Sequence, residues 1–557
     1  MDAEERSDGL DEMRRAYAGR WVALADGRPV GQGSSPEQAL QAARASRYKE
    51  ILRVIFMPPN SPMTLDNILD MVRPFLPADQ PVYVVGGAVR DAMMDKAPHD
   101  VDFALQREAV SVARRVADAL GGAYYLLDEE RGTGRVLLNW KESGRLVLDF
   151  ALLRGLDVES DLRARDFTIN AMAVKTSQSN VLIDPLGGAA DLRRKLLRVC
   201  SSTALVDDPV RIIRGIRFAA ELDFHIQPET TQLMRTAVAE LERVSAERKR
   251  DEIFRILEGP QPAAALRALE AIGALPHILP ELAGLKGVKQ SPPHILDVWS
   301  HTLLCIEKFQ GLIKVLGRKF DEESAADLML GAAALALGRY RLQLAEHLET
   351  RLNPNRSLIG LLNFSLLYHD AAKPLVQTVD EHGRIRAFGH EERGAELAIL
   401  RGEALALSNI EIERVSRIIR NHMRIHMLAR RNQPPSRRAI YRFFRDCGET
   451  GIDICLVTLA DALGTFGHTM PQDLWGAYLD VVRALFDAWW TQPHEDLMPK
   501  PLLNGHQICN ELGLAPGPEI GRLLDALREA QATGQVLDGE SARNFIRARW
   551  KEMTSGN

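Results

Sequence analysis

Two aspartates separated by a single residue, Asp100 and Asp102, constrain this chain more than any other feature of its sequence. They open an apolar segment at 100–105 that is typical of a β-strand, and residues two apart on a strand point to the same face of a sheet. Carboxylates held together in this way repel each other unless they hold cations, and Mg²⁺ prefers carboxylate oxygens and substrate phosphates. Asp149, in a second predicted strand at Leu146–Ala151, can supply a third carboxylate. The pattern indicates a two-metal site, although an Asp-x-Asp sequence alone also occurs at solvated strand edges.

The segment upstream of the aspartates favours a nucleotide-binding site over a solvated edge. A predicted strand at Val82–Val85 runs into Gly86 and Gly87, and Arg90 and Asp91 follow at the start of a predicted helix. Glycine has no Cβ, so the backbone can approach a triphosphate closely, and the amides at a helix N-terminus face the phosphates. At such a site, two Mg²⁺ ions would activate a 3′-hydroxyl and stabilise the departing pyrophosphate.

Charge and cysteine usage exclude several classes of protein. The chain has 557 residues and a net charge of −5, so a nucleic-acid partner would have to be held by local clusters of Lys and Arg. Its five cysteines lie far apart without a CxxC pair, which argues against a zinc knuckle or a disulfide framework. The acidic N-terminus is unlike a signal peptide, and the longest apolar stretch that we identify, Asp327–Gly338, is too short to span a bilayer. We therefore expect a cytoplasmic protein with no membrane partner.

The pattern of apolar residues changes along the chain. Short β-branched runs alternate with helical segments up to about residue 200, which predicts a mixed α/β domain, and from residue 203 the apolar residues follow helical spacing. The fold class that we predict is therefore multidomain. The predicted parts are a small N-terminal module and linker at 1–60, an α/β head at 64–200, a helical neck and body at 201–290, a central helical domain at 291–490, and a helical tail at 491–557.

The N-terminal module has its own turn signals. Trp21–Ala25 is predicted to be a strand, Asp26 and Gly27 a turn, and Val30–Gly33 a returning strand, before a helix that opens near Pro36. This segment resembles a small bacterial domain of uncharacterised role, and we expect an accessory or packing function for it. The segment 58–62, rich in proline, is predicted to be a linker.

Four consecutive segments resemble the motifs of one family. Residues 82–105 resemble the head motif of class II tRNA nucleotidyltransferases and bacterial poly(A) polymerases, a branch of the polymerase β superfamily. Three further family motifs follow in order, at Asp161–Ala173, Ile183–Val199 and Val206–Leu222. The resemblance implies a polymerase-β-like head followed by an all-α neck, body and tail. It also implies that the chain uses Mg²⁺, CTP and ATP and acts on the 3′ end of tRNA.

The resemblance assigns roles to individual residues. Arg165 and Asp166 correspond to the pair that contacts the ribose and phosphates of the nucleotide, with Asn170 supporting them. Asp208 and Arg211 correspond to the pair that reads the Watson–Crick edge of CTP or ATP, which suits an acceptor-only and a donor-only side chain. Because they are three residues apart, we expect them on one face of a helix.

The base-reading motif departs slightly from the family pattern. Asp207 stands where glutamate is usual, and Pro209 follows Asp208. Proline is tolerated in the first turn of a helix, so we interpret the departure as geometric. The predicted nucleotide-binding residues are Gly86, Gly87, Arg90, Asp91, Arg165, Asp166, Asn170, Asp208, Arg211 and Arg214.

The sequence constrains the identity of the added nucleotides less than it constrains the chemistry of the reaction. Bacterial poly(A) polymerases of this class usually carry an Arg-rich patch after the Asp-x-Asp strand, and residues 106–131 look more like the tRNA enzymes, which favours full CCA addition. Enzymes that add only the terminal A, or only the two Cs, share all of these motifs. They differ in a flexible loop, which we expect near 128–145. A-adding, CC-adding and poly(A)-adding activities therefore stay open as alternatives.

A second group of residues lies in the helical half. The order His…His-Asp…Asp resembles that of the HD phosphohydrolase superfamily, and the residues are His301, His369, Asp370 and Asp461. Lys373 has the expected HDxxK position, and His390 and His422 fall where HD proteins with two metals place further ligands. The resemblance implies a divalent ion, either a transition metal or Mg²⁺, that activates water. Some class II tRNA nucleotidyltransferases carry such a domain and hydrolyse 2′,3′-cyclic ends, although the domain could also be a structural remnant.

Two helical segments are candidates for RNA contacts. Arg414–Arg445 contains ten arginines and no acidic residue, so it could grip phosphates, although a solvated helix face is the alternative. Pro501–Leu524 resembles the family's tail, with two helices joined by a Gly-Pro-Gly-like turn. Two rival hypotheses remain at this stage. The chain could be chiefly an HD phosphohydrolase with a degenerate head, or an RNA-binding protein without catalysis.

Overall fold

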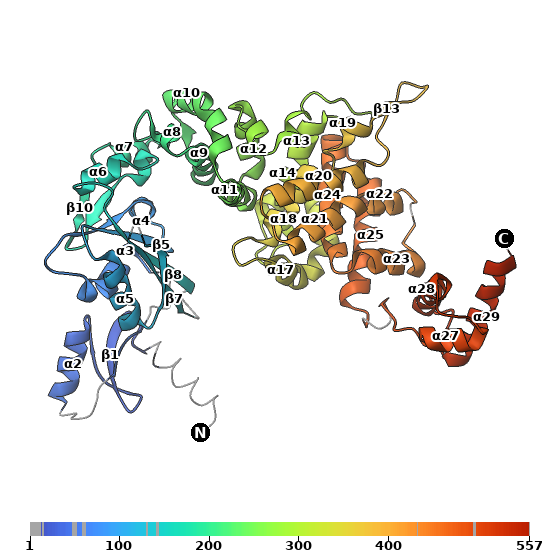
Figure 1. Cartoon of the computed structure of the whole chain (residues 1–557), viewed down its shortest axis with the longest axis horizontal. Helices are drawn as coiled ribbons and strands as arrows, with labels where there is room; N and C mark the ends of the chain where they lie inside the picture. Colours follow the sequence, from blue (N-terminus) through green and yellow to red (C-terminus); the bar gives the residue numbers. More distant parts are fainter. Residues whose placement is uncertain are drawn as a thin grey trace. The chain divides into compact units, whose positions relative to one another are not determined.

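The chain forms two compact units, Met1–Ala237 and Val238–Asn557 (Figure 1). The computed structural model describes residues 13, 16–46, 53–57, 63–129, 132–140, 144–431, 433–493 and 497–555. The predicted linker at 58–62 lies outside the described residues. The division into two units is coarser than the five parts predicted from the sequence, and the boundaries of those parts stay predictions.

The first unit begins with a small three-stranded sheet in the order β2-β1-β3. Its strands are β1 (Arg20–Ala25), β2 (Arg28–Gly33) and β3 (Arg53–Met57). The predicted hairpin is confirmed, as is the helix α2 (Pro36–Ala45), which begins where the Ser35 side chain accepts a hydrogen bond from the Gln38 amide. The third strand was not predicted. Trp21 of β1 is buried and contacts the ring of Phe75, so the module packs against the head.

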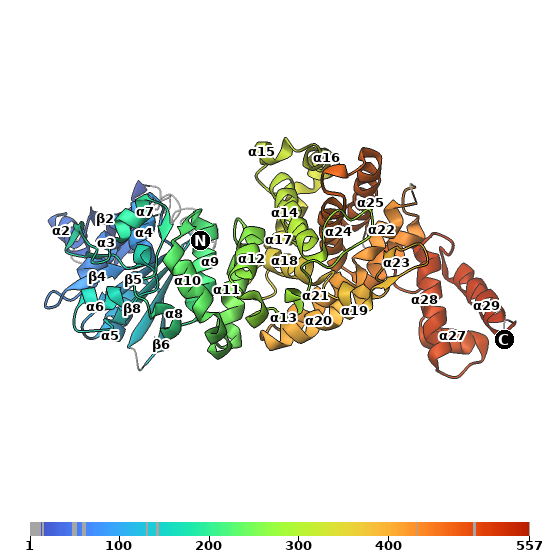
Figure 2. The same ribbon diagram turned by 90° about the horizontal axis from the view of Figure 1, so that it is seen from above.

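The head is built on a seven-stranded mixed sheet in the order β10-β9-β4-β5-β8-β7-β6 (Figure 2). Its strands are β4 (Val82–Val85), β5 (Asp100–Leu105), β6 (Ala123–Asp128), β7 (Thr133–Trp140), β8 (Gly144–Leu152), β9 (Ala173–Lys175) and β10 (Gln178–Ile183). Strands β5 and β8 pair in parallel, and the other neighbouring pairs are antiparallel. Helix α4 (Gly87–Met93) follows β4, and α5 (Ala109–Leu120) packs against β7 and β8.

Strands β5 and β8 place the acidic residues side by side. Asp100 and Asp102 are exposed while the residues between and after them are buried, as the period of two along a strand requires. On the buried face, Phe103 stacks on Phe150 of β8 with ring centroids 4.6 Å apart. The same register sets Asp102 opposite Asp149. Because a slip of one residue would turn the carboxylates into the core, the packing of the buried face fixes their position on the other face.

The segment 128–145, expected to be a flexible loop, is mostly a strand. Residues 133–140 form β7, which pairs with both β6 and β8, and residues 130, 131 and 141–143 lie outside the described residues. Val136 and Leu138 alternate inward and are buried, so the strand is held by the core of the head. The expectation of a long flexible loop across this segment is therefore wrong.

Further helices belong to the first unit, of which α6 lies between β8 and β9 and the others follow β10. They are α6 (Val158–Arg163), α7 (Gly188–Arg193), α8 (Ala204–Asp207), α9 (Val210–Leu222) and α10 (Pro228–Ala237). Phe218 of α9 packs edge-on against Phe167, with ring centroids 6.1 Å apart. This contact fixes α9 against the segment that carries several of the predicted nucleotide-binding residues.

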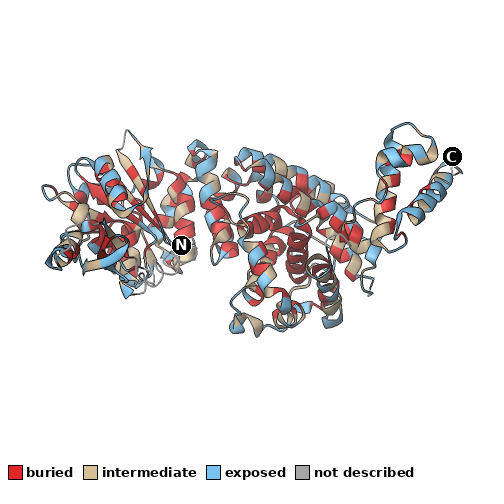
Figure 3. Ribbon diagram, turned by 90° about the horizontal axis from the view of Figure 1, so that it is seen from below, coloured by how far each residue is buried: buried red, intermediate tan, exposed pale blue. Residues whose placement is uncertain are grey.

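The second unit is helical, and its core helices meet around α24 (Thr450–Phe466). The other core helices are α14 (Val298–Leu316), α18 (Leu358–Tyr368), α20 (His390–Ala404), α21 (Asn409–Asn421), α22 (Met423–Ala429) and α25 (Gln472–Trp490). Figure 3 shows that buried residues are concentrated in the helices of this core. The predicted α/β head followed by helical domains is therefore confirmed.

Helix α24 is a core helix, although its composition resembles that of a membrane span. The segment Thr450–Thr469 is long and apolar enough to cross a membrane by length and composition, but 89% of its apolar window is buried inside the structure. Among the described residues, the candidate span by length and composition is therefore Thr450–Thr469, which is longer than Asp327–Gly338, the stretch identified from the sequence as the longest. The burial of α24 among other helices accounts for its composition.

The tail forms a small helical core of its own. Helices α27 (Gly505–Leu512), α28 (Pro518–Ala532) and α29 (Gly539–Ser555) pack through a cluster that includes Leu523 and Leu527. The predicted pair of helices joined by a turn is confirmed. Helix α28 also contacts α23 (Arg437–Cys447), where Arg442 donates two hydrogen bonds to Glu529, at 2.7 and 2.8 Å.

Candidate active sites

Three carboxylates gather on one face of the head's sheet. Asp100 and Asp102 are on β5, and Asp149 lies opposite Asp102 on β8. The Asp102 side chain is accessible from one side, yet desolvation by the surrounding protein raises the pKa of its carboxyl above the usual range. Arg165 opposes this shift, whereas the neighbouring carboxylates of Asp149 and Asp100 add to it. Because these groups disfavour one another's charge, a divalent cation bound between them would relieve the repulsion.

Asp149 has a partner that the sequence analysis did not identify. Arg135 of β7 lies opposite Asp149 in the register of β7 and β8. Its Nε and Nη2 atoms each donate to one Asp149 oxygen at 2.8 Å. Asp149 can therefore ligate a metal only if it shares its carboxylate with Arg135. Its predicted role as a third metal ligand stays a prediction.

Gly86 leaves room for an arginine beside the carboxylates. Its φ of +78° lies in the left-handed region that favours glycine. A Cβ at this position would lie 2.8 Å from Arg165 Nη1 and 3.5 Å from Asp102 Oδ2. Arg165 is held in place by the buried Asp161 of α6, whose Oδ2 accepts from Arg165 Nε at 3.0 Å. The glycine turn, the carboxylates and a fixed guanidinium therefore meet at one place, as a triphosphate site requires.

A chain of hydrogen bonds and one ion pair joins five of the predicted nucleotide-binding residues. Arg90 donates to Asp91 Oδ1 at 2.7 and 2.9 Å, and its Nη1 donates to Asn170 Oδ1 at 2.7 Å. Asn170 Nδ2 in turn donates to Asp166 Oδ1 at 3.3 Å, and Arg214 Nε lies 2.9 Å from Asp166 Oδ2. The structure thus brings together side chains from α4, α9 and the segment between α6 and α7. Their roles toward the nucleotide stay predictions.

Asp208 and Arg211 do not share a helix, so the expectation of one helix face is wrong. Helix α8 ends at Asp207, and Asp208 is extended, with φ of −144° and ψ of 91°. Pro209 explains this, because a residue before proline is disfavoured in the α region. Helix α9 begins only at Val210. The two side chains still approach each other, with Arg211 Nε 3.8 Å from Asp208 Oδ2.

Arg211 ties helix α9 to the backbone around it. Its guanidinium donates to the carbonyls of Ala164, Arg165 and Ala204 at 3.1 to 3.2 Å. These contacts fix α9 against the segment that carries Arg165 and Asp166. For Arg211 to read a base edge, its guanidinium would have to exchange at least one of these carbonyls for the base.

In the second unit, the six His and Asp residues predicted as metal ligands converge. They are His301 on α14, His369 and Asp370 directly after α18, His390 at the start of α20, His422 between α21 and α22, and Asp461 on α24. Each is between 0% and 6% exposed. Buried charges and imidazoles at this density are stable only when they are paired or bind metals. The structure brings all six together, and their role as ligands stays a prediction.

The pair His390 and His422 shows the chemistry of this cluster most clearly. Nδ1 of His390 donates to the Ala387 carbonyl at 2.7 Å, and Nδ1 of His422 donates to the Ile419 carbonyl at 2.6 Å. Burial, followed by the charges of His390 and His369, lowers the pKa of His422 to about 3, so its ring is neutral and Nε2 presents a lone pair. The two Nε2 atoms face each other at 3.2 Å. This arrangement suits imidazoles that share a cation, so the residues fit a divalent metal.

Asp370 lies between two groups of ligands. Its Oδ2 is 3.2 Å from His301 Nε2 and 3.3 Å from His369 Nε2, whereas its Oδ1 is 3.4 Å from His390 Nε2. Burial acts to raise the pKa of Asp370, but His369 and Lys373 outweigh it and hold the pKa well below the usual range. A carboxylate that offers one oxygen to each group can bridge two ions. The donor set therefore suits a two-metal HD site, as the sequence predicted.

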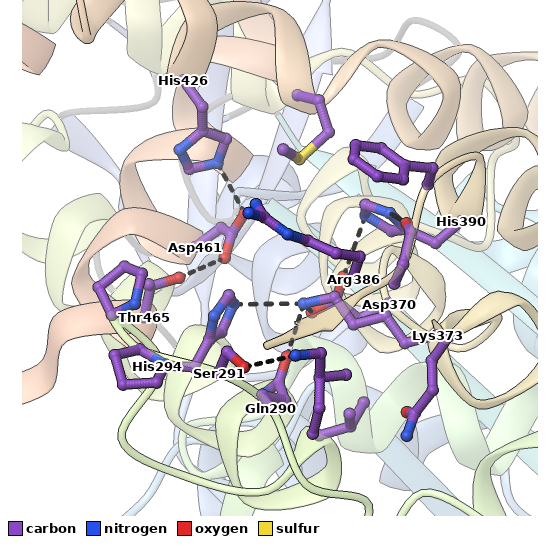
Figure 4. A pocket seen from close by; sticks show the side chains of 18 of the residues that line it. Gln290, Ser291, His294, Asp370, Lys373, Arg386, His390, His426, Asp461 and Thr465 are labelled. Atoms are coloured by element: carbon purple, nitrogen blue, oxygen red, sulfur yellow. Dashed lines mark hydrogen bonds and ion pairs between the residues drawn. The ribbon is translucent and has the colours of Figure 1, made fainter. Parts of the chain in front are cut away.

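Asp461 is oriented by its neighbours on both oxygens (Figure 4). Thr465 donates to Oδ1 at 3.2 Å, and His426 Nε2 lies 2.8 Å from Oδ2. On its other side, His426 Nδ1 is 2.6 Å from the hydroxyl of Tyr478. This chain of contacts leaves Oδ1 facing the nitrogen ligands, because Oδ1 is also 3.2 Å from His301 Nε2.

A cavity of about 730 Å³ gives access to these ligands. Asp370, His390 and Asp461 line it, and so do the cationic residues Lys289, Lys373, Arg384, Arg386 and Arg430. Lys373 Nζ donates to Gln290 Oε1 at 2.7 Å and lies 3.2 Å from His294 Nε2 (Figure 4). A cavity that combines metal ligands with cations can hold a phosphate ester and a water molecule together.

The Arg-rich segment at Arg414–Arg445 is largely neutralised within the fold. Seven of its ten arginines form ion pairs with acids that all lie outside the segment: Arg414, Arg417, Arg420, Arg424, Arg438, Arg442 and Arg445. Arg414 is buried against Asp453 at 2.6 Å and has a structural role. The expected RNA contact therefore depends mainly on the other three arginines, Arg430, Arg431 and Arg437.

Three regions of the chain match known families. Residues 82–198 match the poly(A) polymerase head domain, residues 223–285 match the probable RNA and SrmB-binding site of polymerase A, and residues 339–465 match the HD domain. The fold and the sites thus define a nucleotidyltransferase head joined to an RNA-binding region and an HD domain.

Full-length relatives narrow this class. The chain is 34% identical over 492 residues to the A-adding tRNA nucleotidyltransferase of Deinococcus radiodurans, covering 87% of this chain and 99% of that one. It is 33% identical over 476 residues to the CC-adding tRNA nucleotidyltransferase of Thermus thermophilus, covering 83% and 92%. An apo structure of a CCA-adding enzyme has the same fold, with a TM-score of 0.53 and 21% identity over 86% of this chain and 93% of that one. The chain belongs to the class II tRNA nucleotidyltransferase family, and it is a tRNA nucleotidyltransferase that carries an HD domain.

Several residues in or beside the sites were missed from the sequence. Arg135 and His426 contact predicted ligands that lie 14 and 35 residues further along the chain, and no local motif marks them. Cys305 is different, because its Sγ belongs to a group with ligand atoms of His301, His369 and Asp461 that all lie within 4.8 Å of one another. Its spacing of four residues after His301 was a usable signal, but a cysteine without a CxxC partner was set aside.

Proposed function

We propose that this chain builds or repairs the 3′ CCA end of tRNA by transferring CMP and AMP from CTP and ATP. The observation that carries the proposal is the position of Asp100, Asp102 and Asp149 on one sheet face, beside the Gly86 turn and the Arg165 guanidinium. A tRNA 3′-hydroxyl would attack the α-phosphate there, with pyrophosphate as the leaving group. Mg²⁺ held by Asp100 and Asp102 would make that hydroxyl a better nucleophile and neutralise the charge on the phosphates.

The protein side chains account for binding and orientation. The glycine turn allows the triphosphate to approach the backbone, and Arg165, fixed by Asp161, is placed to contact its oxygens. The chain of contacts from Arg90 through Asn170 to Asp166 holds the ribose-binding residues rigid before the nucleotide arrives. Asp208 and Arg211 would select the base, with Arg211 exchanging backbone carbonyls for the base edge.

A narrower activity is the second candidate. Two full-length relatives are named as an A-adding and a CC-adding enzyme, which favours a chain that performs only one part of CCA synthesis. The specificity loop was expected at 128–145, but much of this segment is the strand β7. The segment therefore gives no support for full CCA addition over a narrower activity. Both candidates share the same chemistry and differ only in which tRNA ends they extend.

The experiment that separates these candidates uses three tRNA substrates. Labelled CTP and ATP, singly and together, are offered with tRNAs that end at the discriminator base, at C, and at CC. Full CCA addition predicts incorporation of both nucleotides into the shortest tRNA. An A-adding enzyme would use ATP on the CC-ended tRNA alone, and a CC-adding enzyme would use CTP alone and stop after the second C. No incorporation into any of them would contradict the whole proposal.

We further propose that the HD domain is a metal-dependent phosphohydrolase. The support is the buried cluster of six ligands under a cavity lined by cations, which suits a phosphate ester, including a 2′,3′-cyclic or phosphorylated RNA end. Within this site, Lys373 is placed to contact a phosphate oxygen. Hydrolysis of such ends by the full chain with added Co²⁺, Ni²⁺ or Mg²⁺, and its loss in His369→Ala, would be the expected result. Equal hydrolysis by the variant would contradict it.

We also place this activity in the cytoplasm. All five cysteines are free thiols, of which Cys305, Cys447 and Cys455 are buried. Free thiols fit a reducing compartment, where tRNA maturation would supply the substrate. Fractionation of the cells that make this protein, with detection of the chain in the soluble fraction, would test the placement.

A further inference from the structure

We propose that Cys305 is a sulfur ligand of the metal bound by His301, His369 and Asp461, and that this half of the HD site therefore selects a thiophilic divalent ion such as Zn²⁺ or Co²⁺. The inference rests on the proposed metal-binding function of the HD domain and goes beyond it. The HD sequence pattern contains only histidines and aspartates, and Cys305 is not part of it.

Helix α14 presents Cys305 and His301 on the same face. The two residues are four apart, so they lie one above the other along the helix. Both side chains are completely buried, and Cys305 Sγ is 3.4 Å from His301 Nε2. Because Sγ is also 3.7 Å from His301 Nδ1, the sulfur lies beside the imidazole ring, within 4.8 Å of ligand atoms of His369 and Asp461.

The distances from His301 Nε2 to the other three donor atoms match those around one tetrahedral ion. His301 Nε2 is 3.3 Å from His369 Nε2, 3.2 Å from Asp461 Oδ1 and 3.4 Å from Cys305 Sγ. With metal–nitrogen bonds of about 2.0 Å and metal–sulfur bonds of about 2.3 Å, neighbouring donors around a tetrahedral ion are separated by roughly 3.3 to 3.6 Å. His369 Nε2 and Asp461 Oδ1, at 3.7 Å, are only slightly further apart, and ligand atoms of all four residues lie within 4.8 Å of one another. Asp370 Oδ2, 3.2 Å from His301 Nε2, is a further oxygen donor beside them.

A glycine on the facing helix makes room for this sulfur. Gly464 lies three residues after Asp461 on α24, and a Cβ there would come within 2.4 Å of Cys305 Sγ. Any larger residue would push the sulfur out of its place, because α14 and α24 pack closely along their length. The close packing of α14 and α24 therefore leaves space for the thiol only because residue 464 is glycine.

Two other buried cysteines in the second unit provide an internal contrast. Cys447 and Cys455 are as buried as Cys305, but neither belongs to a group of potential metal ligands among the residues that the structure describes. A buried cysteine usually behaves as a small apolar residue, and these two fit that description. Cys305 differs from them by its position among imidazoles and carboxylates.

A thiolate changes which ion the site prefers. Soft sulfur ligands favour Zn²⁺ and similar ions, whereas carboxylates and water suit Mg²⁺. The other half of the HD site, formed by Asp370, His390 and His422, contains no sulfur among its described ligands. The two halves would therefore differ in selectivity, and the half with Cys305 would hold its ion more tightly.

Cobalt provides a direct test in the full-length protein. We expect Co²⁺ to produce a near-ultraviolet sulfur-to-cobalt charge-transfer absorption in the wild type, which Cys305→Ser loses and Cys455→Ser, a matched buried cysteine, retains. Cys305→Ser should also lower Zn²⁺ affinity by about tenfold or more, with a smaller change for Mg²⁺. Cobalt bound without this absorption, or the same absorption in Cys305→Ser, would overturn the assignment of Cys305 while leaving the HD metal site intact. No bound cobalt would contradict both.

X-ray absorption spectroscopy tests the assignment of Cys305 on the wild-type protein, so the result does not depend on whether a variant folds. One equivalent of Zn²⁺ should show a sulfur neighbour at about 2.3 Å together with nitrogen and oxygen neighbours at about 2.0 Å. A shell made only of nitrogen and oxygen would overturn the proposal. Gly464→Ala offers a second variant, since its added methyl should displace the sulfur and reduce the cobalt–sulfur absorption without removing a ligand.

Discussion

The two candidate sites of this chain use opposite strategies to hold charge. In the head, Asp100 and Asp102 are exposed at the face of a sheet, and the surrounding arginines are held by other side chains. In the HD domain, His301, His369 and His422 are 0% exposed, and the proposed ligands lie on or directly beside core helices. The open carboxylates of the head suit a substrate that brings its own phosphates. The buried HD cluster suits a metal held by protein side chains, and a cavity leads to it.

The two sites also differ in the donor atoms that they offer to a metal. The head offers carboxylate oxygens, which suit Mg²⁺ together with phosphate oxygens. The HD cluster offers imidazole nitrogens, carboxylates and the Cys305 sulfur, which suit transition metals. On the proposed assignments, the chain would keep two metal chemistries apart by choice of ligand and by burial.

The largest effect is expected in the head. Asp102→Ala removes a central carboxylate, and the loss of several kcal/mol of metal-dependent stabilisation should lower nucleotide incorporation by roughly 10³-fold or more. Single-turnover incorporation of labelled CTP or ATP measures it. Asp118→Ala, an exposed acid on α5, is the matched control and should leave the rate unchanged. Equal rates for Asp102→Ala and the control would end the claim that this sheet face is catalytic.

The next largest effect is expected in the HD domain, as a loss of metal affinity without a loss of nucleotide transfer. Asp370→Asn weakens the residue that faces both ligand groups, so the affinity of the full chain for Co²⁺ should fall by about 100-fold or more. Calorimetric titration of the metal measures this change. Nucleotide incorporation by the same preparation should stay within about twofold of the wild type, because the head lies in the other unit. Parallel loss of both properties would show that the sites are not independent.

A smaller effect is expected from a residue that only orients a ligand. His426→Gln removes the contact to Asp461 Oδ2, and changes of this kind typically weaken metal binding by about 10- to 100-fold. Tyr478→Phe, which removes only the hydroxyl contact to His426, should have a weaker effect in the same direction. Competition with a chelating dye measures both variants. An unchanged affinity in His426→Gln would show that Asp461 needs no support from this side.

The smallest effect concerns a buried histidine that binds no metal in this account. Burial acts to lower the pKa of His347, but the hydrogen bonds that its ring donates to Asp453 and Glu449 outweigh burial and raise the pKa to about 8. Because this folded-state pKa is raised above the ordinary 6.5, its stabilisation is fully present below about pH 6.5 and is lost as the pH rises through about 8. We expect a loss of roughly 1–2 kcal/mol in unfolding free energy across this window. Urea unfolding between pH 6 and 9 measures it.

His347→Gln provides the control for that prediction. The variant should be less stable than the wild type at pH 6, and the difference between the two should shrink by pH 9. A wild-type protein that gains stability over this pH range relative to the variant would contradict the assignment. The comparison would also separate the structural His347–Asp453 pair, 2.7 Å apart, from the histidines of the metal cluster.

The sequence predicted the parts of the molecule that depend on local pattern. The Asp-x-Asp strand is right because a period of two fixes which side chains share a face. Within the HD group, His301 and Asp461 lie on the largely apolar core helices α14 and α24, whose pattern predicts burial. Asp208 was placed wrongly because the effect of Pro209 on the preceding residue was not applied. The loop at 128–145 was placed wrongly because it was drawn across Val136–Leu138, an apolar run with a β-branched first residue that itself favours a strand.

Contacts between distant segments could not be predicted in the same way. The Arg-rich segment looked basic because its acidic partners, such as Glu392, Asp453 and Glu529, lie elsewhere in the chain. Arg135 lies opposite Asp149 because of the register between β7 and β8, which no local motif encodes. Cys305 lies beside His301, His369 and Asp461 because α14 packs on α24. In each case, the information lies in tertiary packing rather than in spacing along the sequence.

The most direct test of the account measures transfer in two reciprocal double variants. Labelled CTP and ATP are offered with a panel of tRNAs that lack all or part of CCA, using the wild type, Asp100→Ala with Asp102→Ala, and His301→Ala with His369→Ala. We predict that the first pair abolishes incorporation and that the second pair incorporates like the wild type while binding no Co²⁺ in the HD domain. Incorporation that survives the loss of Asp100 and Asp102, or that disappears with the two histidines, would contradict the assignment of nucleotidyl transfer to the head.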